Sequence, residues 1–386
     1  MAPSHRALWK SLPTEWQSML RSAHNLDGPP ERRQLADIFS ASSLDLYPPD
    51  GVALSARFDL APLQHFPALE WLDVAEGIDL DTLPPLPRLT TLRVHAPSLP
   101  DDLGARVPAL QHLTLVPQAR HARALRGLGA TEAEVVTGEG INLAVLAQMP
   151  RLRALVMSDG PADQVPQLAA FGRLTHLDLR YTRFSNLAPL AALRRLRALD
   201  LSCTDVFDLA PLAGLTTVKS LSLFGCEAVT ELAPLASLTA LRALDLTDTG
   251  VRSLAPLSAL TALKTLRLDG SKVDTLRALK GLSALTELGA PDTAVHDLRP
   301  LSSLAGLRRL DLRATPVRDL RPLHALPRLR EVNLDQSEVG WAEGEALETA
   351  LRARHPAATV VFQRKPLGDF RGPLDAAAYA ELEALL

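Results

Sequence analysis

Leucine and other apolar residues recur along most of this chain with a nearly constant period. The clearest units match the pattern Leu-x-x-Leu-x-Leu and begin at Leu174, Leu196, Val218, Leu241, Leu263, Leu285, Leu307 and Leu329. Consecutive starts are 22 residues apart, except that Val218 and Leu241 are 23 apart because an extra residue lies within FGCEAVTEL. A repeat sustained over this length indicates a solenoid of stacked units instead of separate globular lobes.

Looser copies of the same unit precede the regular ones. They begin at Leu69, Leu89, Leu110, Ala130 and Leu152, and an irregular first copy begins near Ala41, with an insertion around residues 47–54. These six copies and the eight regular ones predict fourteen strands. We count positions within a repeat from its first apolar residue, so that Leu196 is position 0 and Asp200 is position 4.

The letters of each unit predict a short strand followed by a tight return. In Leu-Asp-Leu the apolar side chains alternate with a polar one, as in a strand with one buried face. The later Leu-x-Pro-Leu segment contains a proline, which favours extended or 3₁₀ turns over full helices. One unit cannot bury its apolar side alone. Stacked units therefore form one continuous core and one parallel sheet.

This pattern resembles the leucine-rich repeat family, in the short form found in bacterial internalins and in the leucine-rich regulator of protein phosphatase 1. The matching segments include LRALDLSCTDVFDLAPLAGL and LRRLDLRATPVRDLRPLHAL, and the resemblance extends over roughly residues 41–363. It implies an α/β solenoid, a horseshoe or arc with a parallel sheet on its concave side, a 3₁₀ or extended convex side, and helical caps at both ends.

The family usually places an inward asparagine after the strand, and this chain departs from that rule. At position 8 it has hydroxyl residues or cysteine, namely Thr182, Thr204, Cys226, Thr249, Ser271, Thr293, Thr315 and Ser337. Hydroxyl groups can supply part of the hydrogen bonding of an asparagine, and we expect Cys226 to do so poorly.

The segments outside the array predict caps for its two open ends. We expect a helical N-terminal cap over residues 1–40, with helices in SLPTEWQSMLRSA and ERRQLADIF, and an array over residues 41–340. A cap helix in GEALETALRARH and a strand in TVVF are expected within residues 341–363. Residues 364–386 form a tail with a possible helix, which could pack on the cap or bind a partner. The opening also contains the Leu-Pro-x-Glu that starts F-box modules, but too few residues precede the first strand for that three-helix module.

Composition argues against several classes of partner. The net charge is −3 with 22% charged residues, which leaves no basic footprint for nucleic acid or an anionic membrane. Two cysteines are too few for a disulfide framework. The start of the chain has no apolar segment typical of Sec export, and no apolar run approaches the roughly 20 residues of a membrane helix. The sequence thus predicts a cytoplasmic protein, and the arginine-rich composition is typical of a bacterial source. Export as an effector by a route other than Sec stays open.

The residues give little indication of catalysis. A glycine-rich phosphate loop, His-Glu-x-x-His and Gly-x-Ser-x-Gly are all missing from the sequence. Asp178 and Asp200 should lie one strand apart, which suggests a pair of carboxylates for acid–base chemistry. An open sheet does not exclude water, however, and we expect the aspartate of Leu-Asp-Leu to be solvated. We therefore predict no enzyme activity, no cofactor, no metal site and no small-molecule substrate.

The outward positions 2, 4, 6 and 7 carry the residues that differ most between repeats. They set aromatic side chains among charged ones, a composition typical of protein-binding hot spots. The predicted partner-binding residues on the concave face are His176, Arg180, Tyr181, Asp200, Phe224, Asp245, Asp248, Arg267, Asp269 and Asp292, with Trp71 as a more isolated anchor. A lone phenylalanine on a strand could instead pack on its neighbours.

The leading functional hypothesis is a non-enzymatic module that binds one or more protein partners on this face, with regulation of a client enzyme as one form of it. The acidic middle of the face favours a basic patch on the partner. The alternative hypothesis is a secreted bacterial effector, or a ubiquitin-ligase-type adaptor, that acts on host proteins.

Overall fold

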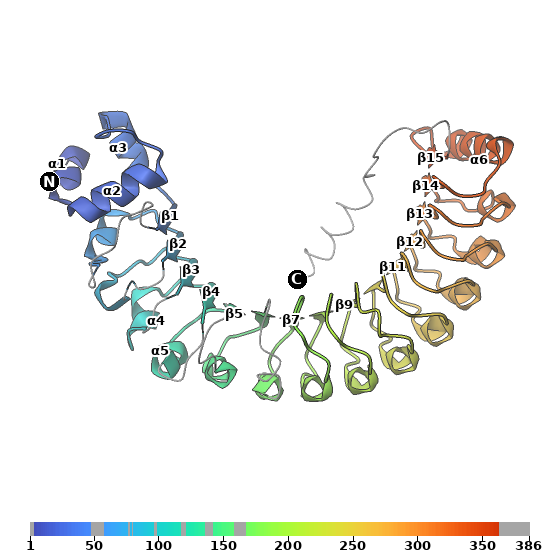
Figure 1. Cartoon of the computed structure of the whole chain (residues 1–386), viewed down its shortest axis with the longest axis horizontal. Coiled ribbons are helices and arrows are strands. Elements are labelled where there is room, and N and C mark those ends of the chain that lie inside the picture. Colours follow the sequence, from blue (N-terminus) through green and yellow to red (C-terminus); the bar gives the residue numbers. More distant parts are fainter. Residues whose placement is uncertain are drawn as a thin grey trace. The chain divides into compact units, whose positions relative to one another are not determined.

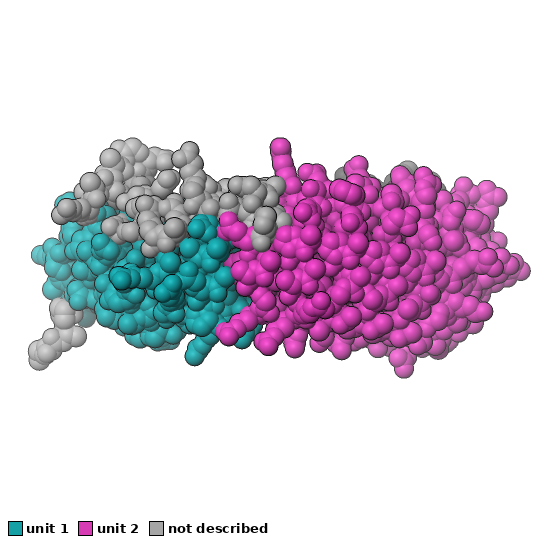
Figure 2. Space-filling view, turned by 90° about the horizontal axis from the view of Figure 1, so that it is seen from below, with its two compact units in different colours: residues 1–157 teal, residues 158–386 magenta. Residues whose placement is uncertain are grey.

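The computed structural model describes residues 4–47, 58–75, 78, 80–95, 99–116, 121–135, 142–157 and 167–362. The chain divides into two compact units, which are residues Met1–Met157 and Ser158–Leu386 (Figure 2). The tail at residues 364–386 and most of the insertion at 47–54 lie outside the described residues. The domain boundaries expected from the sequence stay predictions.

Unit 1 begins with helices that cover its first strand. These are α1 (His5–Ser11), α2 (Thr14–Ala23) and α3 (Arg32–Phe39). The helix predicted in SLPTEWQSMLRSA is α2, with Pro13 as its N-cap residue, whereas α1 was not predicted. The Trp16 ring is buried against Phe58 at a centroid distance of 5.3 Å, and its Nε1 donates to the Asp59 carbonyl oxygen at 2.7 Å. An aromatic cluster thus covers the start of the array.

The strands of unit 1 follow one another in chain order and are parallel. They are β1 (Ser43–Leu46), β2 (Trp71–Val74), β3 (Thr91–Val94), β4 (His112–Leu115), β5 (Glu132–Val135) and β6 (Ala154–Met157). The returns between them are η1 (Ala61–His65), η2 (Leu80–Thr82), α4 (Leu103–Arg106), α5 (Ala122–Arg126) and η4 (Leu143–Gln148). The short helices α4 and α5 replace the predicted 3₁₀ turns. Both sequences, LGAR and ARALR, lack proline, which permits an α-helical turn but does not require one, since η2 and η4 also lack it and are 3₁₀ turns.

Unit 2 contains the regular repeats, with a strand on one side of each and a 3₁₀ turn on the other (Figure 1). The parallel strands are β7 (His176–Asp178), β8 (Ala198–Asp200), β9 (Ser220–Ser222), β10 (Ala243–Asp245), β11 (Thr265–Arg267), β12 (Glu287–Gly289), β13 (Arg309–Asp311), β14 (Glu331–Asn333) and β15 (Thr359–Val361). The turns are η6 (Ala188–Ala192), η7 (Ala210–Gly214), η8 (Ala233–Ser237), η9 (Ala255–Ala259), η10 (Arg277–Gly281), η11 (Arg299–Ser303) and η12 (Arg321–Leu323). The helix α6 (Trp341–Arg354) lies between β14 and β15. The predicted solenoid is confirmed.

Most 3₁₀ turns of unit 2 have proline in the first turn and a side-chain cap before it, although η10 lacks the proline. In η7 the Asp208 Oδ1 accepts the Ala210 N–H at 2.8 Å, and Asp319 caps the N–H of Arg321 in the same way at 3.0 Å. The leucines at positions 0, 3 and 5 are fully buried, as Leu263, Leu266 and Leu268 show. The cap and the proline set the turn, and the leucines fix its distance from the strand.

After each strand of β7 to β14 the chain passes through a left-handed residue at position 7. These residues have φ between 50° and 69° and are Tyr181, Cys203, Gly225, Asp248, Gly270, Asp292, Ala314 and Gln336. At the next position a hydroxyl closes the turn, since the Thr204 Oγ1 donates to the Leu201 carbonyl oxygen at 2.6 Å. Thr182, Thr249, Thr293, Thr315 and Ser337 make the same bond. Hydroxyl groups thus replace the inward asparagine, and the Cys226 thiol instead donates to the Leu201 carbonyl oxygen at 3.1 Å.

Replacing Thr249 with valine should destabilise the protein by about 1–2 kcal/mol, because the buried Leu246 carbonyl would lose the donor that now lies 2.7 Å away. Ser271→Ala is the matched control, since the Ser271 Oγ has no partner and its backbone N–H already bonds the Leu268 carbonyl. Urea unfolding of both variants measures the difference. Equal losses in the two variants would contradict this account of the turn.

Candidate functional site

The residues predicted to bind a partner lie on the outward side of unit 2, on β7 to β12 and just beyond them. The register places Asp178 beside Asp200, Asp200 beside Ser222, and Asp245 between Ser222 and Arg267. Trp71 lies on β2 of unit 1, beside Ser43 and Thr91. The predicted residues of unit 2 therefore share one face.

The aspartates at position 4 are buried and hold the backbone. Asp178, Asp200, Asp245 and Asp311 are between 4% and 9% exposed. Each accepts the N–H of the residue at position 6, at distances of 3.0, 2.9, 2.9 and 3.2 Å respectively. The ladder uses the N–H groups of positions 5 and 7, as Leu201 and Cys203 show, so position 6 needs a side-chain acceptor. The prediction that these aspartates are solvated is wrong.

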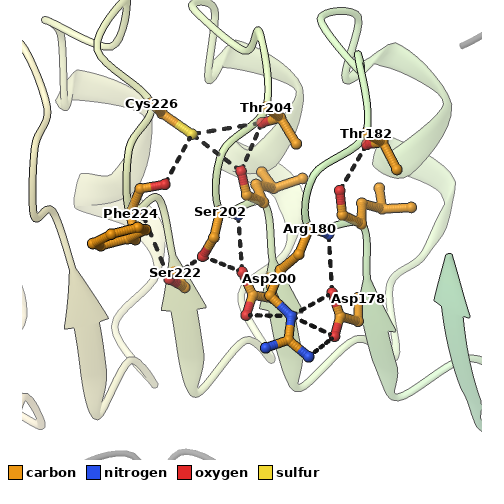
Figure 3. Close-up of polar contacts among 11 residues, drawn as sticks. Asp178, Arg180, Thr182, Asp200, Ser202, Thr204, Ser222, Phe224 and Cys226 are labelled. Atoms are coloured by element: carbon orange, nitrogen blue, oxygen red, sulfur yellow. Dashed lines mark hydrogen bonds and ion pairs between the residues drawn. The ribbon is translucent and has the colours of Figure 1, made fainter. Parts of the chain in front are cut away.

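A continuous polar chain crosses β7, β8 and β9 (Figure 3). The Arg180 guanidinium lies 2.7 Å from the Asp178 carboxylate and 3.6 Å from that of Asp200. The Ser202 hydroxyl donates to Asp200 and lies 2.8 Å from the Ser222 hydroxyl. Burial raises the pKa of Asp200 to about 6, against the opposing effect of the Ser202 hydrogen bonds. Arg180 thus bridges the two carboxylates, and this accounts for their proximity without acid–base chemistry.

The predicted residues differ in how much of them a partner could reach. Tyr181 is 60% exposed, and Asp248 and Asp292 are exposed as well. All three occupy the left-handed position 7, where the chain turns away from the sheet. His176, Arg180, Phe224, Arg267, Asp269 and Trp71 are half-buried, whereas Asp200 and Asp245 are buried. Position 7 therefore presents the most accessible part of the face.

The row of capping aspartates is interrupted at β11 and β12, where position 4 holds Arg267 and Gly289. In the second of these repeats position 6 is Pro291, which has no N–H and so requires no acceptor. In the first, position 6 is Asp269, whose Oδ1 is buried without a hydrogen-bond partner. Burial raises the pKa of Asp269 to about 7, with Arg267 and Arg313 opposing the shift and Asp245 and Asp311 adding to it.

Unit 1 carries its own charged row around Trp71. The Tyr47 hydroxyl donates to Asp73 Oδ1 at 3.1 Å, and Arg93 lies 3.9 Å from Asp73 and 3.4 Å from Glu134. The His112 Nδ1 lies 2.5 Å from a Glu132 carboxylate oxygen. The histidine thus has a carboxylate neighbour. Among the described residues, no group of three or more His, Cys, Asp or Glu side chains could hold a metal ion.

Sequence reasoning missed the parts of this face whose role depends on backbone geometry. Thr247 at position 6 has a buried hydroxyl without a hydrogen-bond partner, and Asp269 packs so closely on Gly289 that a Cβ atom there would lie 3.0 Å from Asp269 Oδ1. Phe207 is 62% exposed and precedes η7 instead of lying on a strand. The signal available in the sequence was the break in the aspartate row at Arg267 and Gly289. No described helix is both long enough and apolar enough to span a membrane.

Replacing Asp269 with asparagine should stabilise the protein above pH 7 and have little effect near pH 4. The folded-state pKa of about 7 exceeds the ordinary value of 3.8, so the native protein loses stability as pH rises from about 4 to about 7. The asparagine variant does not lose stability in this way, because its side chain does not ionise. Its Tm near pH 8 should exceed that of the parent by roughly 2 °C or more, and thermal unfolding at several pH values measures it.

Asp297→Asn is the control of opposite sign, because hydrogen bonds from Arg299 lower the pKa of Asp297 to about 2. Its stability difference from the parent should stay constant between about pH 5 and pH 8. A difference for Asp269→Asn that is equally independent of pH would contradict the raised pKa.

Comparison with known proteins places these repeats among leucine-rich repeats. Residues 191–292 match the family model of the leucine-rich repeat domain of the endo-β-N-acetylglucosaminidase EndoS. No curated protein matches the chain in sequence. The structure is similar to that of an internalin from Listeria monocytogenes, with a TM-score of 0.60, 16% identity, and coverage of 95% of this chain and 99% of the internalin.

A second similar structure is the functional domain of the Listeria monocytogenes internalin InlJ, which its description says includes a cysteine ladder. The TM-score is 0.50 at 17% identity, over 86% of this chain and 80% of that one. At these identities the likeness concerns the fold. The repeat period, the parallel strands, the 3₁₀ returns and these matches together make this chain a leucine-rich repeat protein that resembles the internalins.

Proposed function

We propose that this chain is a non-enzymatic protein-interaction module that binds a protein partner on the outward face of β7 to β12. The observation that carries the proposal is that different positions of each repeat have different structural roles. The leucines are buried in the core and the aspartates of position 4 hold the backbone, whereas position 7 presents varied side chains, among them the exposed Tyr181, Asp248 and Asp292.

The accessible side chains have the composition of a protein-binding surface. Tyr181 is an exposed aromatic residue, and Phe224 is half-buried at position 6 two repeats further on. Asp248 and Asp292 place exposed carboxylates on the same row. Aromatic anchors surrounded by charge are typical of hot spots, and a surplus of carboxylates favours a basic partner surface. The backbone behind them is fixed by the parallel ladder, so little conformational entropy is lost on binding.

A client enzyme that the module regulates, and a cytoplasmic location, are the finer parts of this proposal. The first is supported by the sequence resemblance to the phosphatase regulator, and the second by the two cysteines, both of which are free. Activity assays of any captured enzyme with and without the module, and cell fractionation, test these two parts separately.

The double substitution Tyr181→Ala and Phe224→Ala should weaken capture of a direct partner at least tenfold. Truncating two aromatic anchors removes contacts that typically contribute about 2 kcal/mol or more each at a hot spot. The measurement is affinity capture from the source cell with quantitative mass spectrometry, followed by titration of the purified partner against each variant.

Phe207→Ala is the matched control, because it removes an equally exposed aromatic ring that lies off the strand face. It should leave the affinity unchanged. A partner that binds the double variant as tightly as the parent, while the thermal stability of both is the same, would move the interface away from this face.

A further inference from the structure

Asp269 carries a carboxylate oxygen for which the repeat fold provides no donor. Its Oδ1 is buried and has no hydrogen-bond partner. The aspartates at position 4 differ, since Asp178, Asp200 and Asp245 each receive a backbone N–H. A buried polar oxygen without a donor destabilises the folded state. The reason for an aspartate here therefore lies outside the packing of the repeats.

A second buried polar atom without a partner belongs to the neighbouring repeat. Thr247 is 8% exposed, and its Oγ1 lies beside the Asp245 carboxylate without the geometry of a hydrogen bond. Thr247 and Asp269 both occupy position 6, on consecutive repeats. The Asp248 N–H donates to the Asp269 carbonyl oxygen at 2.7 Å, which joins the two backbones at this level. Side chains two residues beyond the aligned strand ends lie on the same outward side.

The following repeat packs against Asp269 without offering it a hydrogen-bond donor. Position 4 there is Gly289, and a Cβ atom at that residue would lie 3.0 Å from Asp269 Oδ1. Position 6 is Pro291, which has no N–H to offer the carboxylate. The chain thus has a buried acceptor and a buried hydroxyl that their neighbours do not satisfy. The Asp269 side chain as a whole is half-buried, so a partner can reach it from the outward side.

We propose that Asp269 and Thr247 receive one basic side chain of the bound protein partner, an arginine or a lysine, at the ends of β10 and β11. A guanidinium or ammonium group has several N–H donors and can bond the carboxylate and the hydroxyl together. The inference rests on the proposed function, because it names the chemistry that the same face recognises.

The charges around this point favour a cation over a neutral donor. Asp245 and Asp311 influence the Asp269 carboxyl, and Asp248 and Asp292 are exposed on the row beside it. Two positive charges, the guanidinium groups of Arg267 and Arg313, lower the pKa of Asp269. Arg313 is already paired with Asp311 at 2.9 Å. Carboxylates therefore outnumber guanidinium groups, and a basic side chain gains from this surplus.

The test is a titration of the full chain near pH 8 with short peptides that contain one arginine, one lysine or one glutamine between glycines. The backbone amide signals of Gly270 and Gly289 report binding by NMR. Saturable shifts are expected with the arginine and lysine peptides, and the glutamine peptide should bind at least tenfold more weakly. Absence of saturable shifts in the millimolar range, or equal binding of the glutamine peptide, overturns the proposal.

Variants then locate the bound cation. Asp269→Asn should weaken binding of the arginine or lysine peptide by roughly tenfold to a hundredfold, as expected for loss of a charge-assisted hydrogen bond. Thr247→Val should weaken binding of the same peptide by a smaller factor. Asp274→Asn is the matched control, because it removes an exposed carboxylate from the same repeat, and it should change nothing. Unchanged binding to folded Asp269→Asn overturns the proposal.

These outcomes are distinguishable from failure of the proposed function. If the aromatic double variant loses its partner while Asp269→Asn binds partner and peptides as the parent does, the protein-binding face stands and the cation site is wrong. If the peptides bind at Gly270 and Gly289 but no partner depends on the face, the cation site stands and the proposed function is wrong.

Discussion

Burial of the leucine rows between consecutive repeats is the interaction on which the rest of the structure depends. Leu241, Leu263 and Leu285 occupy position 0 of successive repeats and are fully buried. Each such side chain contributes about 1.5–3 kcal/mol when it leaves water, but it can do so only if a neighbouring repeat is present. The ends of the array therefore need covers. Trp16 of α2 supplies one in unit 1, and Leu347 and Leu351 of α6 supply one in unit 2.

Stacking also commits the backbone to a parallel ladder that leaves one amide per repeat without a carbonyl acceptor. The side chain at position 4 satisfies this amide, and a serine, asparagine or aspartate serves in most repeats of unit 2. Where Gly289 cannot serve, Pro291 removes the amide that would need it. The outward face is thus partly structural. Among the residues predicted to bind a partner, Asp200 and Asp245 are required by hydrogen bonding within the repeat.

The fold could be predicted from the sequence because its signal is periodic and each repeat confirms the next. Leu-x-x-Leu-x-Leu fixes the strand, and Leu-x-Pro-Leu fixes the return. The roles of residues on the outward face were harder to predict, since one residue type can have two roles there. Asp200 at position 4 and Asp269 at position 6 are both outward aspartates in the sequence, but the first caps the Ser202 N–H and the second has a buried oxygen without a partner. The left-handed backbone at Tyr181 and Asp248 was also hidden, because glycine marks that position only at Gly225 and Gly270. The short helix α1 was not predicted, because Trp9 is its one buried residue and it therefore has no apolar period.

A repeat array allows an outward residue to be judged against its own neighbours, which a globular domain does not. The same backbone environment recurs, so a residue whose burial is balanced by a hydrogen bond in one repeat and unbalanced in another differs for a reason other than the fold. Position 6 holds Ser202 in one repeat, whose hydroxyl bonds Asp200, and Arg313 in another, which is paired with Asp311. Asp269 occupies the same position and has a buried oxygen without a partner. Stability alone favours a residue at this position that needs no donor, and the proposed binding of a basic partner side chain would account for a carboxylate there.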